Sequence, residues 1–133
     1  MLHKFQLRTT DRSQMVNITE QVREVIGKLG AGEGLVTVYC PHTTAGITIN
    51  EGADPDVIRD MLLYLDECYP WEHPRCRHGE GNSAAHLKAS MTGASQAIPF
   101  VNGDMILGTW QAIFFCEFDG PRNRTFFVKV IEG

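Results

Sequence analysis

The first residues of the chain alternate between hydrophobic and polar side chains, which predicts a strand over residues 3–9. A period of two is typical of a strand that buries one face. Residues 34–40 and 46–50 are rich in β-branched side chains and predict two more strands. The polar segment between them contains His42, so we expect this histidine on a loop where two strands end.

The segment after the first strand has hydrophobic residues at helical spacing, and these are Ile18, Val22, Val25, Ile26 and Leu29. Such spacing forms a stripe along one side of a helix, which then faces the core. We expect Asn17 to cap this helix and Glu20, three residues later, to complete a capping box. Gly30 is the expected end, because glycine commonly follows the last residues of a helix.

A second helix is predicted to begin at Asp54 and Pro55. Proline fits the first helical position, and an aspartate before it accepts the free backbone N–H groups. The segment 68–82 then has no periodicity of either kind and predicts a long loop, and loops of this length are usually functional or mobile. A short helix follows over residues 83–91 and is expected to end at Gly93.

The last third of the chain predicts antiparallel strands at residues 96–101, 104–109, 111–118 and 124–131. Asn102 and Gly103 form the kind of two-residue turn that hairpins prefer. The order of these elements predicts an α+β fold, mainly antiparallel sheet with two to three helices.

Composition narrows the class of protein. With 133 residues, 43% of them hydrophobic, the chain can form an ordinary core, and we predict a single domain over residues 1–133. Sixteen acidic residues against 12 basic residues argue against non-specific binding to nucleic acid. Neither a signal peptide nor a run of about 18 apolar residues is recognisable. We therefore expect a cytoplasmic protein with no membrane partner, whose four scattered cysteines stay reduced.

Three of the five histidines lie in segments dense with small polar residues. From its loop, His42 can bind a metal or move a proton, although a hydrogen bond to the backbone would explain it equally well. His78 and His86 flank a glycine-rich turn and the first turn of a helix, a spacing that can bring both rings to one point. Imidazole suits zinc and other divalent transition metals, but this spacing matches no standard metal motif.

Residues 79–84 fit the pattern Gly-x-Gly-x-x-Ala, yet no apolar strand precedes them, so we reject a Rossmann fold. A glycine turn that enters a helix still exposes backbone N–H groups at the positive end of the helix dipole. Gly79 and Gly81 are therefore candidates for a phosphate site, and Glu80 beside them favours a phosphate accompanied by a divalent cation. A capped helix after a glycine loop explains the same residues without a ligand.

Carboxylates also gather around the start of the second predicted helix. Helix capping alone explains Asp54, Asp56 or both. Glu51 lies between a strand and a glycine and has no evident capping role. It is a candidate general base, metal ligand or hydrogen-bond partner of His42.

Two arginines lie at the tip of the last predicted hairpin. Arg122 and Arg124 can bind phosphate through paired N–H groups. They can also form ion pairs with Glu117 and Asp119 at a surface or a subunit contact, and we favour this second explanation.

Three motifs in combination are more specific than any one of them. Residues 42–51 read HTTAGITINE, residues 78–88 read HGEGNSAAHLK, and GTWQ at 108–111 leads to EFDGPR at 117–122. In this order and at this spacing the chain resembles the YjbQ family over essentially its whole length. The resemblance implies a compact α+β domain that assembles as a homotrimer. It also implies a weak or secondary thiamine-phosphate synthase activity, which joins a pyrimidine diphosphate to a thiazole phosphate and releases pyrophosphate.

The motifs of the YjbQ family fall on particular residues of this chain. The metal ligands that we predict with their help are His42, His78 and His86. The predicted catalytic residues are Glu51, Glu80 and Asn82. The predicted contacts to substrate or phosphate are Thr44, Asp54, Gly79, Gly81, Thr109 and Gln111.

The expected cofactor is a divalent metal ion. Three histidines favour a zinc-like ion, whereas diphosphate chemistry ordinarily uses magnesium and carboxylate oxygens; we give the ligand chemistry more weight and keep magnesium as the alternative. The leading hypothesis is a metal-assisted transferase that acts on a small phosphorylated metabolite. A metal-dependent phosphate-ester hydrolase would use the same residues to activate water. A non-catalytic trimeric protein that binds a metabolite or a metal is the third hypothesis.

Overall fold

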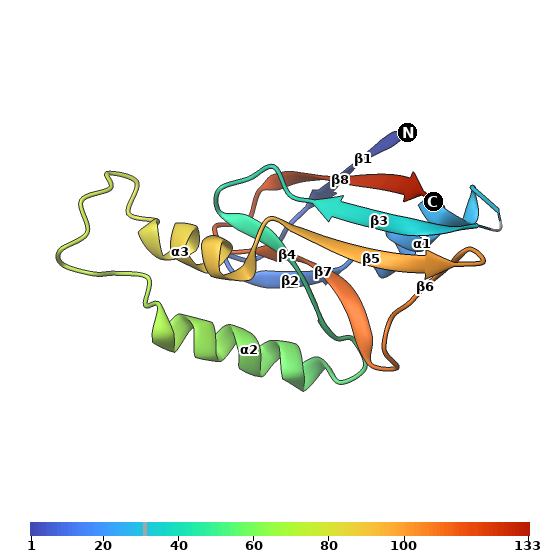
Figure 1. Cartoon of the computed structure of the whole chain (residues 1–133). Helices are drawn as coiled ribbons and strands as arrows, with labels where there is room; N and C mark the ends of the chain where they lie inside the picture. The colour runs from blue at the N-terminus through green and yellow to red at the C-terminus, as the bar shows by residue number, and fades with distance from the viewer. Residues whose placement is uncertain (31) are drawn as a thin grey trace.

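Strand pairing divides the chain into two antiparallel sheets in the computed structural model, which describes residues 1–30 and 32–133. The five-stranded sheet has the order β1-β8-β3-β5-β6, and the three-stranded sheet has the order β2-β7-β4 (Figure 1). The strands are β1 (Leu2–Arg8), β2 (Gln14–Asn17), β3 (Glu33–Tyr39), β4 (Ala45–Glu51), β5 (Ser95–Val101), β6 (Asp104–Met105), β7 (Gln111–Glu117) and β8 (Asn123–Glu132). The helices are α1 (Thr19–Gly27), α2 (Pro55–Cys68) and α3 (Ser83–Thr92).

The main core lies between the two sheets. Val36 and Phe126 of the five-stranded sheet and Phe115 of the three-stranded sheet are buried there in one hydrophobic cluster. Helix α1 adds Val22 and Ile26 to the same cluster, which confirms the predicted apolar stripe of this helix. The predicted α+β class, with a mainly antiparallel sheet and a single compact domain, is therefore confirmed.

Strand β7 is buried on both faces, which explains its continuous hydrophobic sequence. Ile113 and Phe115 face the core between the sheets. Phe114 and Cys116 face a second cluster, to which α2 and α3 contribute. Figure 1 shows α2 on the side of the three-stranded sheet that faces away from the five-stranded sheet.

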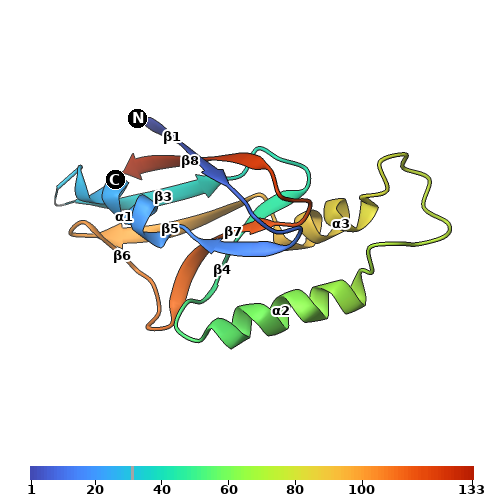
Figure 2. The same ribbon diagram turned by 180° about the vertical axis from the view of Figure 1, so that it is seen from behind.

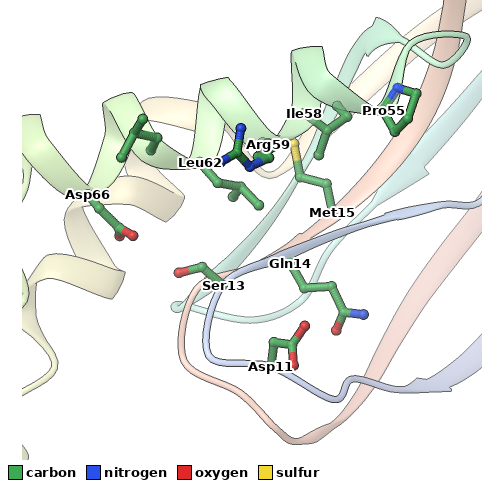
Figure 3. Close-up of a pocket in the computed structure, with 10 residues that line it drawn as sticks. Asp11, Ser13, Gln14, Met15, Pro55, Ile58, Arg59, Leu62 and Asp66 are labelled. Atoms are coloured by element: carbon green, nitrogen blue, oxygen red, sulfur yellow. The ribbon is translucent and has the colours of Figure 1, made fainter.

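Helix α2 packs loosely on its sheet. None of its residues is buried, and Tyr64 is 69% exposed. A groove of about 510 Å³ lies between α2 and β2, with Met15, Ile58 and Leu62 among the residues that line it (Figure 3). Figure 2 shows β2 above α2 at this edge of the three-stranded sheet.

Several predicted boundaries are confirmed by the backbone. Asp54 caps α2 and accepts a hydrogen bond from the backbone N–H of Asp56 at 2.9 Å. Helix α3 ends at Gly93, whose φ of 99° suits glycine. Asn102 and Gly103 both have positive φ, as a type I′ hairpin turn requires. No helix in the described ranges has the length and hydrophobicity needed to cross a membrane.

The predicted capping box of α1 is wrong. Ile18 is the N-cap residue, and the Asn17 carboxamide oxygen accepts hydrogen bonds from the backbone N–H and the hydroxyl of Thr19 instead. Glu20 pairs with Arg23 one turn further along, so it does not reach back to the cap.

Two other predictions differ from the structure. The predicted strand 104–109 shortens to two residues of β6, because the chain turns after Met105 and Ile106 is exposed. Leu29 also lies outside the core, since α1 ends at Gly27 before Leu29 can join the apolar stripe.

Candidate functional site

His78 and His86 come together at the start of α3. Their ring centroids are 5.4 Å apart and the ring planes are nearly perpendicular, at 86°. The turn between them closes with a hydrogen bond from the backbone N–H of Gly81 to the carbonyl of His78 at 3.0 Å. Gly81 has a φ of 71°, which L side chains rarely adopt. The glycine turn therefore positions these two predicted metal ligands beside each other.

The two rings face different cavities. His78 lines a cavity of about 700 Å³ together with Glu80, Gly81 and residues of the long loop. His86 lines another cavity, of about 470 Å³, together with His42 and Ser90. Because the rings are close to each other, the histidine pair lies where the two cavities approach.

His42 accepts a hydrogen bond from the backbone. Its Nε2 atom lies 3.0 Å from the backbone nitrogen of Thr125 in β8. Strand β3 pairs with β8 only as far as Tyr39, which lies opposite Phe127, so no residue of β3 pairs with Thr125. The imidazole of His42 provides the acceptor that a continuing β3 would provide. The backbone-bonded alternative for this histidine is therefore the one that the structure adopts.

The surroundings of His42 favour its neutral form. Burial lowers the pKa of His42 below its ordinary value of 6.5, and the positive charge of Arg124 lowers it further. The ring also lies edge-on to Phe115, with centroids 6.4 Å apart. Burial and the Arg124 guanidinium both penalise the imidazolium, so the surroundings favour the neutral form of His42.

A buried ion pair lies beneath the His42 loop. Arg124 of β8 binds both carboxylate oxygens of Glu117 in β7, which confirms the ion-pair explanation for this arginine. The pair is internal rather than at a surface, because the end of the sandwich closes around it. Arg124 also donates to the hydroxyl of Thr44 at 2.8 Å. Thr44 was predicted to bind phosphate, but it is buried and its hydroxyl is engaged with the guanidinium.

Asn82 lies behind the glycine turn and is buried. Its Nδ2 atom donates to Asp119 at 2.8 Å, and Arg122 donates to the same carboxylate oxygen at 2.9 Å. Among the described residues, Asn82 Oδ1 is the one buried side-chain nitrogen or oxygen with no hydrogen-bond partner. Asn82 was predicted to be catalytic, and its contacts fasten the start of α3 to the β7–β8 turn.

The other predicted site residues lie at the opposite end of the three-stranded sheet. Ala45, near His42, pairs with Glu117, whereas Glu51 pairs with Gln111 at the far end of the same two strands. The six residue-to-residue steps from Ala45 to Glu51 separate the two ends by about 20 Å. Within one chain Glu51 therefore does not meet His42, which excludes an intrachain hydrogen bond between them, one of the three roles considered for Glu51.

Local hydrogen bonds explain several polar residues at this far end. Glu51 accepts from the backbone N–H of Asp54, the N-cap residue of α2, at 3.1 Å, a local role that the sequence did not reveal. Gln111 accepts from the backbone N–H of Gly108 at 2.8 Å. Thr109 and Gln111 line a separate cavity of about 340 Å³ with Trp110.

The described residues contain no group of three or more His, Cys, Asp or Glu side chains arranged to hold a metal ion. The Nε2 atom of His42 accepts a hydrogen bond from the backbone of β8, so only His78 and His86 remain together from the predicted three-histidine set.

The sequence did not reveal the role of Lys88, which is buried on α3 and forms an ion pair with Asp66 of α2. The one sequence signal for its burial is its position on the same face of the helix as the small apolar residues Ala84, Ala85 and Ala89.

Comparison with known proteins identifies the family to which this chain belongs. A family model described as "UPF0047 protein YjbQ-like" matches residues 3–133. The chain belongs to this family. It is 56% identical to the UPF0047 protein YugU of Bacillus subtilis over 131 residues, which cover 98% of this chain and 99% of YugU. It is 48% identical to the UPF0047 protein MJ1081 of Methanocaldococcus jannaschii, covering 98% of this chain and 94% of that protein.

Solved structures of the family have the same fold. A crystal structure of a conserved YjbQ/UPF0047 protein from Clostridium acetobutylicum matches with a TM-score of 0.94 and 51% identity, covering 97% of this chain and 99% of that one. The hypothetical protein APE1520 from Aeropyrum pernix K1 matches with a TM-score of 0.93 and 36% identity, covering 100% and 99%. The double-sheet architecture is therefore common to bacterial and archaeal members.

Proposed function

We propose that this YjbQ-family chain is a cytoplasmic, metal-assisted enzyme that acts on a small phosphorylated metabolite. The activity that we assign to it is transfer of the thiamine-phosphate synthase type, from a pyrimidine diphosphate to a thiazole phosphate. One observation carries the proposal: His78 and His86 lie 5.4 Å apart, by ring centroids, at the glycine turn where α3 begins. That arrangement combines two nitrogen ligands with a helix N-terminus.

The chemistry of these donors suits a divalent transition metal. Imidazole nitrogen is a common ligand of zinc-like ions, and catalytic zinc sites keep at least one position open. His78 and His86 would hold the ion, with further positions available to water, to substrate or to a neighbouring subunit. When bound, the ion would supply a Lewis acid for a phosphate oxygen.

The residues around the pair support binding of an anionic group. The first N–H groups of a helix have no partner within the helix, and the helix dipole adds positive potential there. Gly79 leaves open space at its Cα, so a phosphate can approach the backbone closely. Glu80 is exposed on the cavity that His78 lines, where its carboxylate can accept a proton from a reacting group.

A homotrimer would bring one end of the three-stranded sheet of one copy to the opposite end of that sheet in the next copy. In a head-to-tail ring, the end with Thr109 and Gln111 in one copy meets the histidine end of the next. Subunit contacts would also cover exposed apolar side chains: Trp110 is 63% exposed, and Met91 of α3, beside α2 and Thr48, is 64% exposed. The trimer expected from the family resemblance therefore suits the divided site.

The transfer reaction is tested by assay of the purified protein with zinc or magnesium. Pyrophosphate release from the pyrimidine diphosphate should require the thiazole phosphate and should fall at least tenfold in His86→Ala. His3→Ala, on the distant edge strand β1, is the matched control and should keep the activity. Phosphate or pyrophosphate release without the thiazole partner would identify a hydrolase instead.

A non-catalytic role is the second candidate, and the hydrogen bonds of the polar residues favour it. Thr44, Glu51, Asn82 and Gln111 all bind other groups of the same chain. A protein that retains a metabolite through native mass spectrometry, yet turns over neither substrate with any metal, would establish this role and overturn the enzymatic one.

A further inference from the structure

We propose that His42 binds a phosphate oxygen of the ligand through its Nδ1–H group and is not a ligand of the metal. The inference rests on the proposed function, because it assigns a contact to the phosphorylated ligand in the cavity that His42 shares with His86. It also divides the three predicted metal ligands into two classes with different chemistry.

The hydrogen bond to Thr125 determines the tautomer of His42. A neutral imidazole carries one proton, on either Nδ1 or Nε2. Nε2 accepts the backbone N–H of Thr125 at 3.0 Å, so the proton is on Nδ1. The backbone at Thr125 has little freedom to move, because β8 pairs it with Gln6 of β1. A protonated Nδ1 has no lone pair for a metal ion, and Nε2 has its lone pair engaged.

The Nδ1–H group is available to a ligand. His42 is half-buried and lines the cavity of about 470 Å³. In the described part of the chain, the hydrogen bond that Nε2 accepts from Thr125 is the one hydrogen bond of the ring. Nδ1 is also not among the buried unpartnered atoms, so it is accessible to solvent. A donor that is fixed in direction and free of partners is preorganised for an acceptor.

The lining of the cavity suits an anionic oxygen. Its described lining residues are His42, Thr43, Ala45, His86, Ala89, Ser90, Gly93 and Ala94, which include no carboxylate. Thr43 and Ser90 add hydroxyl groups that can donate to the same ligand. Arg124 behind His42 is held in its ion pair with Glu117 and is not among the residues that line the cavity. The neutral imidazole therefore recognises phosphate by hydrogen bonding rather than by its own charge.

NMR of the unmodified protein tests the tautomer directly. Long-range ¹H–¹⁵N spectra of the imidazole rings should show His42 protonated at Nδ1 and unprotonated at Nε2. One equivalent of zinc should shift the ¹⁵N resonances of the His78 and His86 rings and leave those of His42 unchanged. Protonation at Nε2, or zinc coordination by His42, would overturn the inference. If zinc shifts the ¹⁵N resonances of none of the three rings, the proposed metal function fails, while the assignment of the His42 proton to Nδ1 is unaffected.

Two variants distinguish the roles of the two ring nitrogens of His42. His42→Asn keeps an N–H donor near the position of Nδ1, and His42→Gln keeps an acceptor near the position of Nε2. With inorganic pyrophosphate as the calorimetric probe, we expect His42→Gln to lose about tenfold in affinity, because a hydrogen bond to a charged group is lost. His42→Asn should stay within about threefold of wild type. Equal losses in both variants, or loss of zinc binding in either, would overturn the proposal.

Discussion

Arg124 and Glu117 form a two-point ion pair inside the protein, where the arginine side chain is 5% exposed and the glutamate 0%. The pair connects β8 of one sheet to β7 of the other. Glu117 also accepts from the Thr9 hydroxyl at 3.0 Å and from the backbone N–H of Asp119 at 2.9 Å. Because every oxygen of the carboxylate is occupied, the cost of burying its charge is offset.

Breaking this pair should destabilise the fold strongly. Glu117→Gln leaves the buried guanidinium without its counter-charge, and removal of one partner of a buried pair typically costs about 3–5 kcal/mol. Urea unfolding measures the change. Glu20→Gln is the matched control, because its pair with Arg23 is exposed and should leave the urea midpoint unchanged. Equal midpoints for Glu117→Gln and wild type would contradict this role.

Acid should weaken the fold through His42. Its folded pKa is lowered below the ordinary value of 6.5, first by burial and then by Arg124. The unfolded chain therefore takes up this proton at a higher pH than the folded chain. The free energy of unfolding is unaffected by His42 above pH of about 6.5 and decreases as the pH falls through the folded pKa.

His42→Gln checks this pH dependence, since glutamine keeps an acceptor for Thr125 and does not titrate. Urea midpoints at pH 7 and pH 5 should differ less in this variant than in wild type. The same pH dependence in both proteins would show that His42 does not contribute.

The four cysteines should divide into two classes. Cys40 and Cys116 are buried, and burial raises the pKa of Cys116 to about 12. Cys68 and Cys76 are exposed. A thiol reagent at pH 8 should therefore modify two thiols quickly in the native protein and four after unfolding, because the thiolate is the reactive form. Cys68→Ser should reduce the fast class to one, and four fast thiols in wild type would contradict the burial pattern.

Gly46 should not tolerate a side chain. A Cβ atom built there would lie 2.6 Å from the carbonyl oxygen of Gly93, which accepts the backbone N–H of Ile47. Gly46→Ala must push β4 away from the end of α3, at a cost of about 1–3 kcal/mol. Its melting temperature should fall, whereas Gly79→Ala, with open space around its Cα, should melt like wild type. A normal melting temperature for Gly46→Ala would disprove the close approach.

Periodicity revealed those elements whose burial is simple. The apolar stripe of α1 faces one core, and β1 alternates because only one of its faces is covered, with Phe5 packed against the core and Lys4 exposed. Strand β2 escaped notice because four residues, Gln14–Asn17, are too few to establish a period. The loose packing of α2 was also hidden, since an amphipathic pattern does not specify how closely a helix approaches its sheet.

The candidate site was predictable where it is local in sequence. His78 and His86 converge because one turn and the start of one helix join them. His42 and Glu51 are close in sequence, yet a strand between them carries them to opposite ends of the sheet. The burial of Arg124 depends on the pairing of distant strands, which motif spacing does not report.

Zinc binding tests the central proposal, a metal site built on His78 and His86. Isothermal titration of chelator-treated protein, with native mass spectrometry for stoichiometry, should find one zinc ion per chain in wild type and in His3→Ala. His86→Ala should lose at least tenfold in affinity while keeping the wild-type urea midpoint. No zinc uptake by wild type, or unchanged uptake by folded His86→Ala, would contradict the proposal.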